Sequence, residues 1–206
     1  MSIRSISELL QDLDSQLSGE HVTLDEVLKG FHERGFGFFL FIFALPTALP
    51  LPGLGINLII ALPLLLLTAQ QAMGRKTIWL PQSWKTKKIE RKKISTMISK
   101  ALPYMRKIEH LIQPRLGFVT QGLFSNIIGI LGFIMALSVC LPVPLTNTVP
   151  SLGIAIMAVG VIMRDGLSVT IGALIGTAWV LMLLLIVMFL GAEGIDVFKD
   201  TLKSFI

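Results

Sequence analysis

Hydrophobic residues are concentrated in three long stretches of the chain that contain no charged side chain. The stretches run from Gly35 to Gly74, from Leu116 to Met163 and from Gly166 to Ala192. An apolar run of about 20 residues is long enough to cross a bilayer as a helix, so the three stretches have room for roughly five helical passes or half-passes. The pattern therefore predicts an all-α integral membrane protein.

Proline and glycine interrupt the first two stretches in a similar way. Residues 44–57 read ALPTALPLPGLGIN, and residues 142–155 read PVPLTNTVPSLGIA. At an offset of 98 residues, five of the twelve positions from Pro46 to Asn57 are identical. Proline and glycine break helices and free backbone groups that need other partners inside a bilayer. Two interpretations stay open: paired broken helices that form a transport site between repeats, or tight turns that each join two helices.

The two interrupted stretches are expected to be helical-hairpin repeats. Only about ten residues separate Gly35 from Pro46, and at 1.5 Å per residue they cover ~15 Å, half of the hydrocarbon core. The first helix is therefore either re-entrant or continues through the prolines with a kink, whereas Leu54–Gln71 is long enough to span. We expect the hairpins to be related by a pseudo-two-fold axis, with inverted topology favoured.

The segments outside these stretches have the pattern of amphipathic helices. Ser5 with Glu8, and Thr23 with Glu26, fit the capping box that begins a helix. They predict two short helices, split at Ser18-Gly19, on the membrane surface or on the bundle. Residues 94–112 predict a basic interfacial helix that is kinked or split at Pro103, and residues 195–206 a short amphipathic tail. The expected regions are 1–34 (amphipathic helices), 35–74 (first repeat), 75–115 (basic loop and helix), 116–192 (second repeat and last transmembrane helix) and 193–206 (tail).

Charge is distributed unevenly along the chain. Residues 75–115 hold twelve Lys and Arg against Glu90 and Glu109, a net charge of +10, whereas the first 34 residues hold three basic and seven acidic groups, a net charge of −4. Basic loops next to membrane segments stay in the cytoplasm, so this loop is expected on that side. Trp79 and Trp84 follow the first repeat, where interfacial anchors are typical. The expected partner of the basic loop is a bilayer with anionic headgroups, not nucleic acid.

The composition supports the membrane prediction and offers little for catalysis. The chain has 206 residues, of which 53% are hydrophobic and only 15% are charged. The three apolar stretches contain no carboxylate, histidine or lysine, and we find no motif for a nucleophile, a metal or a phosphate-binding loop. The single cysteine, Cys140, cannot form an intrachain disulfide. We expect no enzyme activity, no cofactor and no metal site.

The proline segments are the best candidate binding site in the sequence. Proline is favoured in the first turn of a helix, so helices are expected to start near Pro52 and Pro150. A helix N-terminus presents free N–H groups and partial positive charge, which suit an anion. Arg164 and Asp165 are expected at an interfacial helix end terminated by Gly166, with gating or headgroup contact as the alternative role. The candidate substrate-binding residues are Pro46, Thr47, Pro52, Gly53, Gly55, Asn57, Pro144, Thr146, Asn147, Pro150, Ser151 and Gly153.

Two parts of the chain carry a family resemblance: the first proline segment followed by QQAMGRKTIWLP, and the segment LPVPLTNTVPSLGIAIMAVGVIMRDG. Together they resemble the ExoD family of bacterial inner-membrane proteins. The resemblance implies a helical protein of the inner membrane that is linked to exopolysaccharide synthesis, with no defined molecular activity. The first hypothesis is a small transporter or channel for an anion or small polar solute. The alternative is a non-transporting scaffold of a polysaccharide synthesis complex. Two repeats in so short a chain also favour a homodimer.

Overall fold

The computed structural model describes residues 6–31, 34–49, 56–140 and 147–204, and this part of the chain is mostly helical. It also holds a pair of three-residue antiparallel strands, in which Val22 pairs with Ile89. The elements are α1 (Ile6–Gln16), β1 (His21–Thr23), α2 (Leu24–Phe31), α3 (Gly35–Ala48), α4 (Ile56–Ala72), α5 (Gln82–Lys85), β2 (Lys88–Glu90), α6 (Arg91–Leu111), η2 (Gly117–Thr120), α7 (Leu123–Cys140), α8 (Thr148–Met163) and α9 (Gly166–Ser204).

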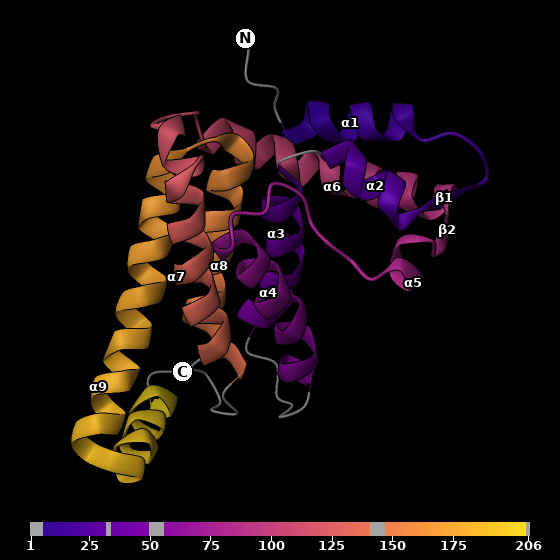
Figure 1. Cartoon of the computed structure of the whole chain (residues 1–206). Coiled ribbons are helices and arrows are strands. Elements are labelled where there is room, and N and C mark those ends of the chain that lie inside the picture. Colours follow the sequence, from indigo (N-terminus) through magenta and orange to yellow (C-terminus); the bar gives the residue numbers. More distant parts are fainter. Residues whose placement is uncertain (1–5, 32–33, 50–55, 141–146, 205–206) are drawn as a thin grey trace.

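Four helices, α3, α4, α7 and α8, form an antiparallel bundle, and α9 packs against its side through α8 and α7 (Figure 1). The most extensive contacts inside the bundle join α3 to α8 and α4 to α7. Fully buried apolar side chains fill the space between the helices, among them Ala44, Leu64 and Met135. Burial of this apolar surface holds the four helices together.

Close contacts at two glycines show how the helices are directed. A Cβ atom on Gly37, near the start of α3, would lie 2.8 Å from the carbonyl oxygen of Ala158, near the end of α8. A Cβ atom on Gly129, near the start of α7, would lie 2.6 Å from the carbonyl carbon of Gln71, at the end of α4. Both hairpins therefore begin and finish at the same end of the bundle, which we call the near end. The opposite end, at the bottom of Figure 1, is the far end.

The two hairpins match at an offset of 92 residues. The first helices end at Ala48 and Cys140, the second helices begin at Ile56 and Thr148, and the two contact glycines are also 92 residues apart. If the bundle is rotated about its axis so that α3 falls on α7 and α4 falls on α8, the contact of α3 with α8 falls on the contact of α7 with α4. The two hairpins thus run in the same direction along the bundle.

This arrangement differs from the inverted topology favoured from the sequence. Residues 73–122, which connect the hairpins, begin and end at the near end, so the second hairpin enters in the same direction as the first. The 98-residue offset is also not the structural one. It pairs Pro46, which lies inside α3, with Pro144, which is outside the described residues. It also pairs Gly55, which is outside them as well, with Gly153 in the second turn of α8.

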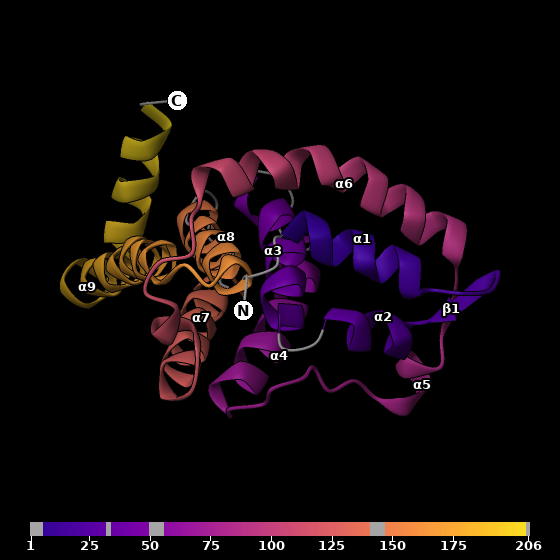
Figure 2. The same ribbon diagram turned by 90° about the horizontal axis from the view of Figure 1, so that it is seen from above.

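Beside the near end lies a smaller layer, the cap, formed by α1, β1, α2, α5, β2 and α6. Figure 2 shows α1 between α6 and α2, with α5 beyond α2, and the contacts between helices agree. Its core joins the apolar faces of α1, α2 and α6 to the last two turns of α8. The buried residues are Leu10, Leu13, Leu17, Val22, Val27, Phe31, Ile98, Met105, Val159, Ile162 and Met163.

The cap corrects two expectations and contains one feature that was not expected. Buried Ile98 and Met105 turn the apolar stripe of α6 toward α1 and the bundle instead of toward lipid. Pro103 lies inside one continuous helix and does not split it. The two short strands were not foreseen, because three residues are too few to produce a recognisable alternation.

Two helices have the length and apolar composition to cross a membrane, within the residues that the structure describes. They are Leu123–Cys140 and Gly166–Phe189. The expected single tract from Gly117 instead begins with the 3₁₀ turn η2, and α9 runs on as helix to Ser204, so the predicted tail is not a separate element.

Candidate functional site

Four buried polar side chains lie at the far end of the bundle, within about one turn of the helix ends. They are Thr47 near the end of α3, Ser138 near the end of α7, and Asn147 and Ser151 at the start of α8. Because α3 and α8 pack antiparallel, the end of α3 lies beside the start of α8. Polar side chains from both repeats therefore share one layer of the bundle, which we call the far-end polar layer.

The hydroxyl groups of this layer differ in their partners. Thr47 Oγ1 donates to the carbonyl oxygen of Ala44 over 2.8 Å, which satisfies it within its own helix. The Oγ atoms of Ser138 and Ser151 are buried and have no hydrogen-bond partner among the described residues. A buried hydroxyl without a partner costs about 1–3 kcal/mol, so each such group in a native protein calls for an explanation.

The structure places the predicted site residues in different surroundings. Pro46 lies in the last turn of α3 and Pro150 in the first turn of α8, which begins two residues earlier, at Thr148. Asn57 lies in the first turn of α4, with its side chain outside the described part. Thr47, Asn147 and Ser151 come together at the far end. The predicted residues outside the described ranges are Pro52, Gly53, Gly55, Pro144 and Thr146.

Gly153 has a packing role in the structure. A Cβ atom there would lie 2.9 Å from the carbonyl oxygen of Gly172 and from Cα of Gly176, both on α9. Its lack of a side chain lets α8 and α9 approach at backbone distance, as small residues do at helix contacts in membranes. Gly153 therefore faces α9.

Ser138 was not among the predicted site residues. The only sequence signal is a single hydroxyl residue in the apolar second half of α7, and a serine in such a helix is not distinctive by itself. Its burial and its missing partner are visible only once the helices are packed.

A second polar layer lies at the near end. Gln71 Nε2 donates to Ser125 Oγ over 3.4 Å, while Gln71 Oε1 has no partner in the described part of the chain. Thr68 Oγ1 donates to the carbonyl oxygen of Leu64 over 2.7 Å. The bond from Gln71 joins α4 to α7, the bond from Thr68 lies within α4, and one amide oxygen is left without a partner among the described residues.

Arg164 and Asp165 form the junction between α8 and α9. Arg164 adopts a left-handed conformation (φ 54°), and the N–H groups of Arg164 and Asp165 donate to the carbonyl oxygens of Val161 and Gly160. This is the hydrogen-bond pattern of a Schellman motif, so Arg164 terminates the helix and the expected role of Gly166 is wrong. Asp165 then caps α9 by accepting hydrogen bonds from the N–H groups of Leu167 and Ser168.

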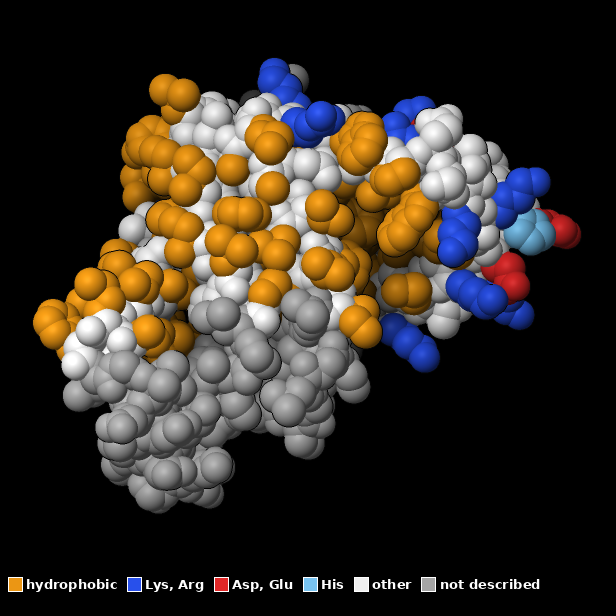
Figure 3. All heavy atoms as spheres, turned by 60° about the horizontal axis from the view of Figure 1, so that its bottom comes forward, with side chains coloured by type: hydrophobic (Ala, Val, Ile, Leu, Met, Phe, Trp, Pro, Cys, Tyr) orange, Lys and Arg blue, Asp and Glu red, His pale blue; other side chains and the backbone are white. Residues whose placement is uncertain are grey.

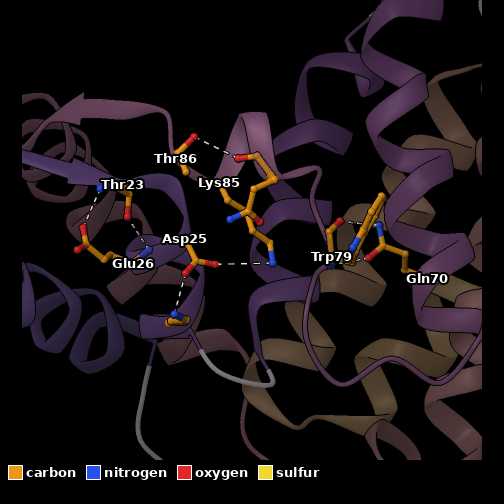
Figure 4. A network of polar contacts seen from close by, with 9 residues as sticks. Thr23, Asp25, Glu26, Gln70, Trp79, Lys85 and Thr86 are labelled. Carbon is orange, nitrogen blue, oxygen red and sulfur yellow. Dashed lines mark hydrogen bonds and ion pairs between the residues drawn. The ribbon is translucent and has the colours of Figure 1, made fainter.

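A polar network lies on the cap (Figure 4). Thr23 and Glu26 form the predicted capping box, with Thr23 N–H donating to Glu26 Oε2 over 2.7 Å and Glu26 N–H donating to Thr23 Oγ1 over 3.3 Å. The hydrogen bond from Lys29, 2.7 Å away, lowers the pKa of Asp25, and Lys85 stands 4.0 Å from the same carboxylate. A cavity of about 290 Å³ beside this network is lined by Thr23, Asp25, Lys29, Gln82, Lys85 and Thr86.

Within the described residues, no three His, Cys, Asp or Glu side chains come together as a metal site.

The bundle and its apolar surface define an all-helical protein with two helices that have the properties of membrane spans. The chain belongs to the ExoD family, whose description is "Exopolysaccharide synthesis, ExoD" and whose profile matches residues 6–185. It is 35% identical over 203 residues to an uncharacterized protein of Synechocystis sp., covering 96% of each chain. It is 28% identical over 176 residues to Protein ExoD of Rhizobium meliloti, covering 83% of this chain and 72% of the relative. No solved structure matches the chain.

Proposed function

We propose that this chain is a multi-pass protein of a bacterial inner membrane that transports an anion or small polar solute linked to exopolysaccharide synthesis. The far-end polar layer is the proposed solute site. The observation that carries the proposal is the pair of buried hydroxyl groups at Ser138 and Ser151 without partners among the described residues. A solute with hydrogen-bonding groups would satisfy them, and the positive end of the α8 dipole would favour negative charge.

The proposed membrane orientation places the cap and the basic segment 75–115 in the cytoplasm, by the positive-inside rule. The 14 residues of α3 would cover only ~21 Å of a hydrocarbon core that is ~30 Å thick. Both hairpins return to the end from which they enter. We take them as short or re-entrant hairpins, which would leave the far-end polar layer within reach of the opposite side.

Flux into liposomes that contain the purified full-length protein tests this proposal. We expect uptake of at least one solute in a panel of inorganic anions and small polar molecules, and thermal stabilisation of the protein by the same solute. Ser151→Ala should weaken the affinity for that solute about tenfold, as the loss of one hydrogen bond worth ~1.4 kcal/mol would. The variant should fold normally, because it removes a buried hydroxyl that lacks a protein partner.

Thr68→Ser is the matched control, since its hydroxyl lies at the near end and bonds to its own helix. This variant should keep wild-type flux. If the wild-type protein transports none of the panel and none of these solutes raises its melting temperature, the transport proposal is wrong.

The alternative function is a scaffold that does not transport and that organises a polysaccharide synthesis complex. The observation that favours it is the cap, which adds a second apolar core beside the end of α8 and carries the basic segment. In that case synthesis enzymes would co-purify with the wild-type protein and be lost when the cap is altered, with no flux in liposomes. For either function we propose a homodimer, which size determination in detergent or nanodiscs tests.

A further inference from the structure

Two tryptophans lie exposed in the stretch that leads from the bundle into the cap. Trp79 and Trp84, in the segment between α4 and β2, are 53% and 60% exposed. Tryptophan has a large apolar ring with one polar N–H group, and it is typical of surfaces that are apolar on one side and wet on the other. Two such rings five residues apart therefore point to a surface that something covers.

The protein holds these rings by their backbone, not by packing around them. Gln70, in the last turn of α4, accepts a 2.6 Å hydrogen bond from the Trp79 N–H group and donates one of 3.2 Å to the Trp79 carbonyl oxygen (Figure 4). The Trp84 N–H group donates to the carbonyl oxygen of Pro81 over 2.9 Å at the start of α5. The backbone that carries both rings is thus held in place while the rings stay exposed.

Basic groups surround this segment. The Arg75 guanidinium carbon lies 6.0 Å from the centre of the Trp79 ring, and Lys76, Lys87 and Lys88 are exposed. On the face that Figure 3 shows, hydrophobic side chains are spread over the bundle and reach the cap, and Lys and Arg side chains lie along the outer part of the cap. We call the segment from Arg75 to Lys88 the tryptophan edge. It begins where the exposed apolar surface of α4, with Leu62 and Leu66, comes to an end.

We propose that the tryptophan edge rests on the anionic phospholipid headgroups of the membrane that holds the bundle, so that the cap lies flat against that membrane. Tryptophan rings at headgroup level with Lys and Arg beside them are the usual membrane–water boundary of a helical protein. Since the edge follows directly from α4, the rings reach this boundary without any rearrangement of the bundle. The inference depends on membrane insertion and not on the proposed solute site.

Fluorescence quenching by spin-labelled lipids tests the contact in the full-length protein. The third tryptophan, Trp179 in α9, is first replaced (Trp179→Phe), so that only the edge emits. In vesicles of phosphatidylglycerol and phosphatidylcholine we expect a shallow doxyl label to quench the edge at least twofold more than a deep one. Quenching should also be stronger when the label is on phosphatidylglycerol than when it is on phosphatidylcholine.

Charge variants then test the preference for anionic lipid. Replacing Lys76, Lys87 and Lys88 together with Gln should abolish that preference. The matched control replaces Lys100, Arg106 and Lys107 of α6, which lies at the opposite edge of the cap (Figure 2), and should retain the preference.

The inference is wrong if aqueous iodide quenches the fluorescence of Trp79 and Trp84 and neither doxyl-labelled lipid does. The variant Trp79→Phe/Trp84→Phe, which leaves only Trp179, reports on membrane insertion separately. If Trp179 is quenched by the deep label while the edge is not, the bundle is inserted and the tryptophan edge faces another partner.

Discussion

At the scale of single residues, the bundle uses glycine where two helices touch and hydroxyls that bond to their own helix. Thr47 and Thr68 each donate to a carbonyl oxygen one turn earlier, so their burial needs no partner on a neighbouring helix. Ser138 and Ser151 depart from this rule. The contrast separates residues that serve packing from those that are candidates for binding.

The first prediction concerns the contact of α7 with α4. In Gly129→Ala the new Cβ atom would meet the backbone of Gln71 at 2.6 Å, so the two helices must move apart. We expect a loss of about 1–3 kcal/mol of stability, as overpacking typically costs, measured by thermal unfolding in detergent. Gly35→Ala is the control, because its nearest neighbours would lie 3.5 Å away. Equal stability of the two variants would contradict the close contact.

A second residue-scale prediction concerns the left-handed conformation of Arg164, which L-residues adopt at a cost. Arg164→Gly removes this cost, whereas Arg164→Ala retains it. The glycine variant should therefore be more stable than the alanine variant by about 1 kcal/mol in thermal unfolding. The opposite order would mean that the junction between α8 and α9 is built differently.

At the scale of elements, periodicity predicted most helices, but not what each one packs against. The apolar stripe of α6 and the capping box at Thr23 were both readable in the sequence, and the capping box is confirmed by its two hydrogen bonds. The stripe alone could not distinguish lipid from protein as its neighbour. Only the packed structure shows α1 covering it, through residues such as Leu13 and Met105.

The attachment of α1 to α6 gives a prediction at this scale. Glu109 accepts hydrogen bonds from Ser7, over 2.5 Å from the N–H group and 2.8 Å from Oγ. Glu109→Ala should release the start of α1 at a cost of about 1.5–3 kcal/mol per charged hydrogen bond, seen as faster hydrogen exchange in α1. Glu90→Ala, which removes an exposed pair with Lys93, should leave exchange in α1 unchanged. Equal exchange in both variants would show that this contact does not hold α1.

At the scale of the whole molecule, the sequence predicted two hairpin repeats but neither their direction nor their register. Direction depends on which end of the bundle each helix starts from, and the length of the first helix was ambiguous around Pro46. Register was drawn from proline positions, whereas the contacts that fix it are made by Gly37 and Gly129. These glycines carry no distinguishing sequence pattern, so the parallel relation became visible only in the packed bundle.

The direction of the repeats gives the last prediction. In a Cys140→Ser background, single cysteines are placed at Leu49, after α3, and at Thr148, the first residue of α8. Parallel repeats put both at the far end, so an impermeant maleimide added outside intact cells should label both. Lys92→Cys in the cap should react only after the cells are made permeable, which checks that the membrane is sealed. Inverted repeats would place residues 49 and 148 on opposite sides, and labelling of only one of them from outside would show that the hairpins do not share a direction.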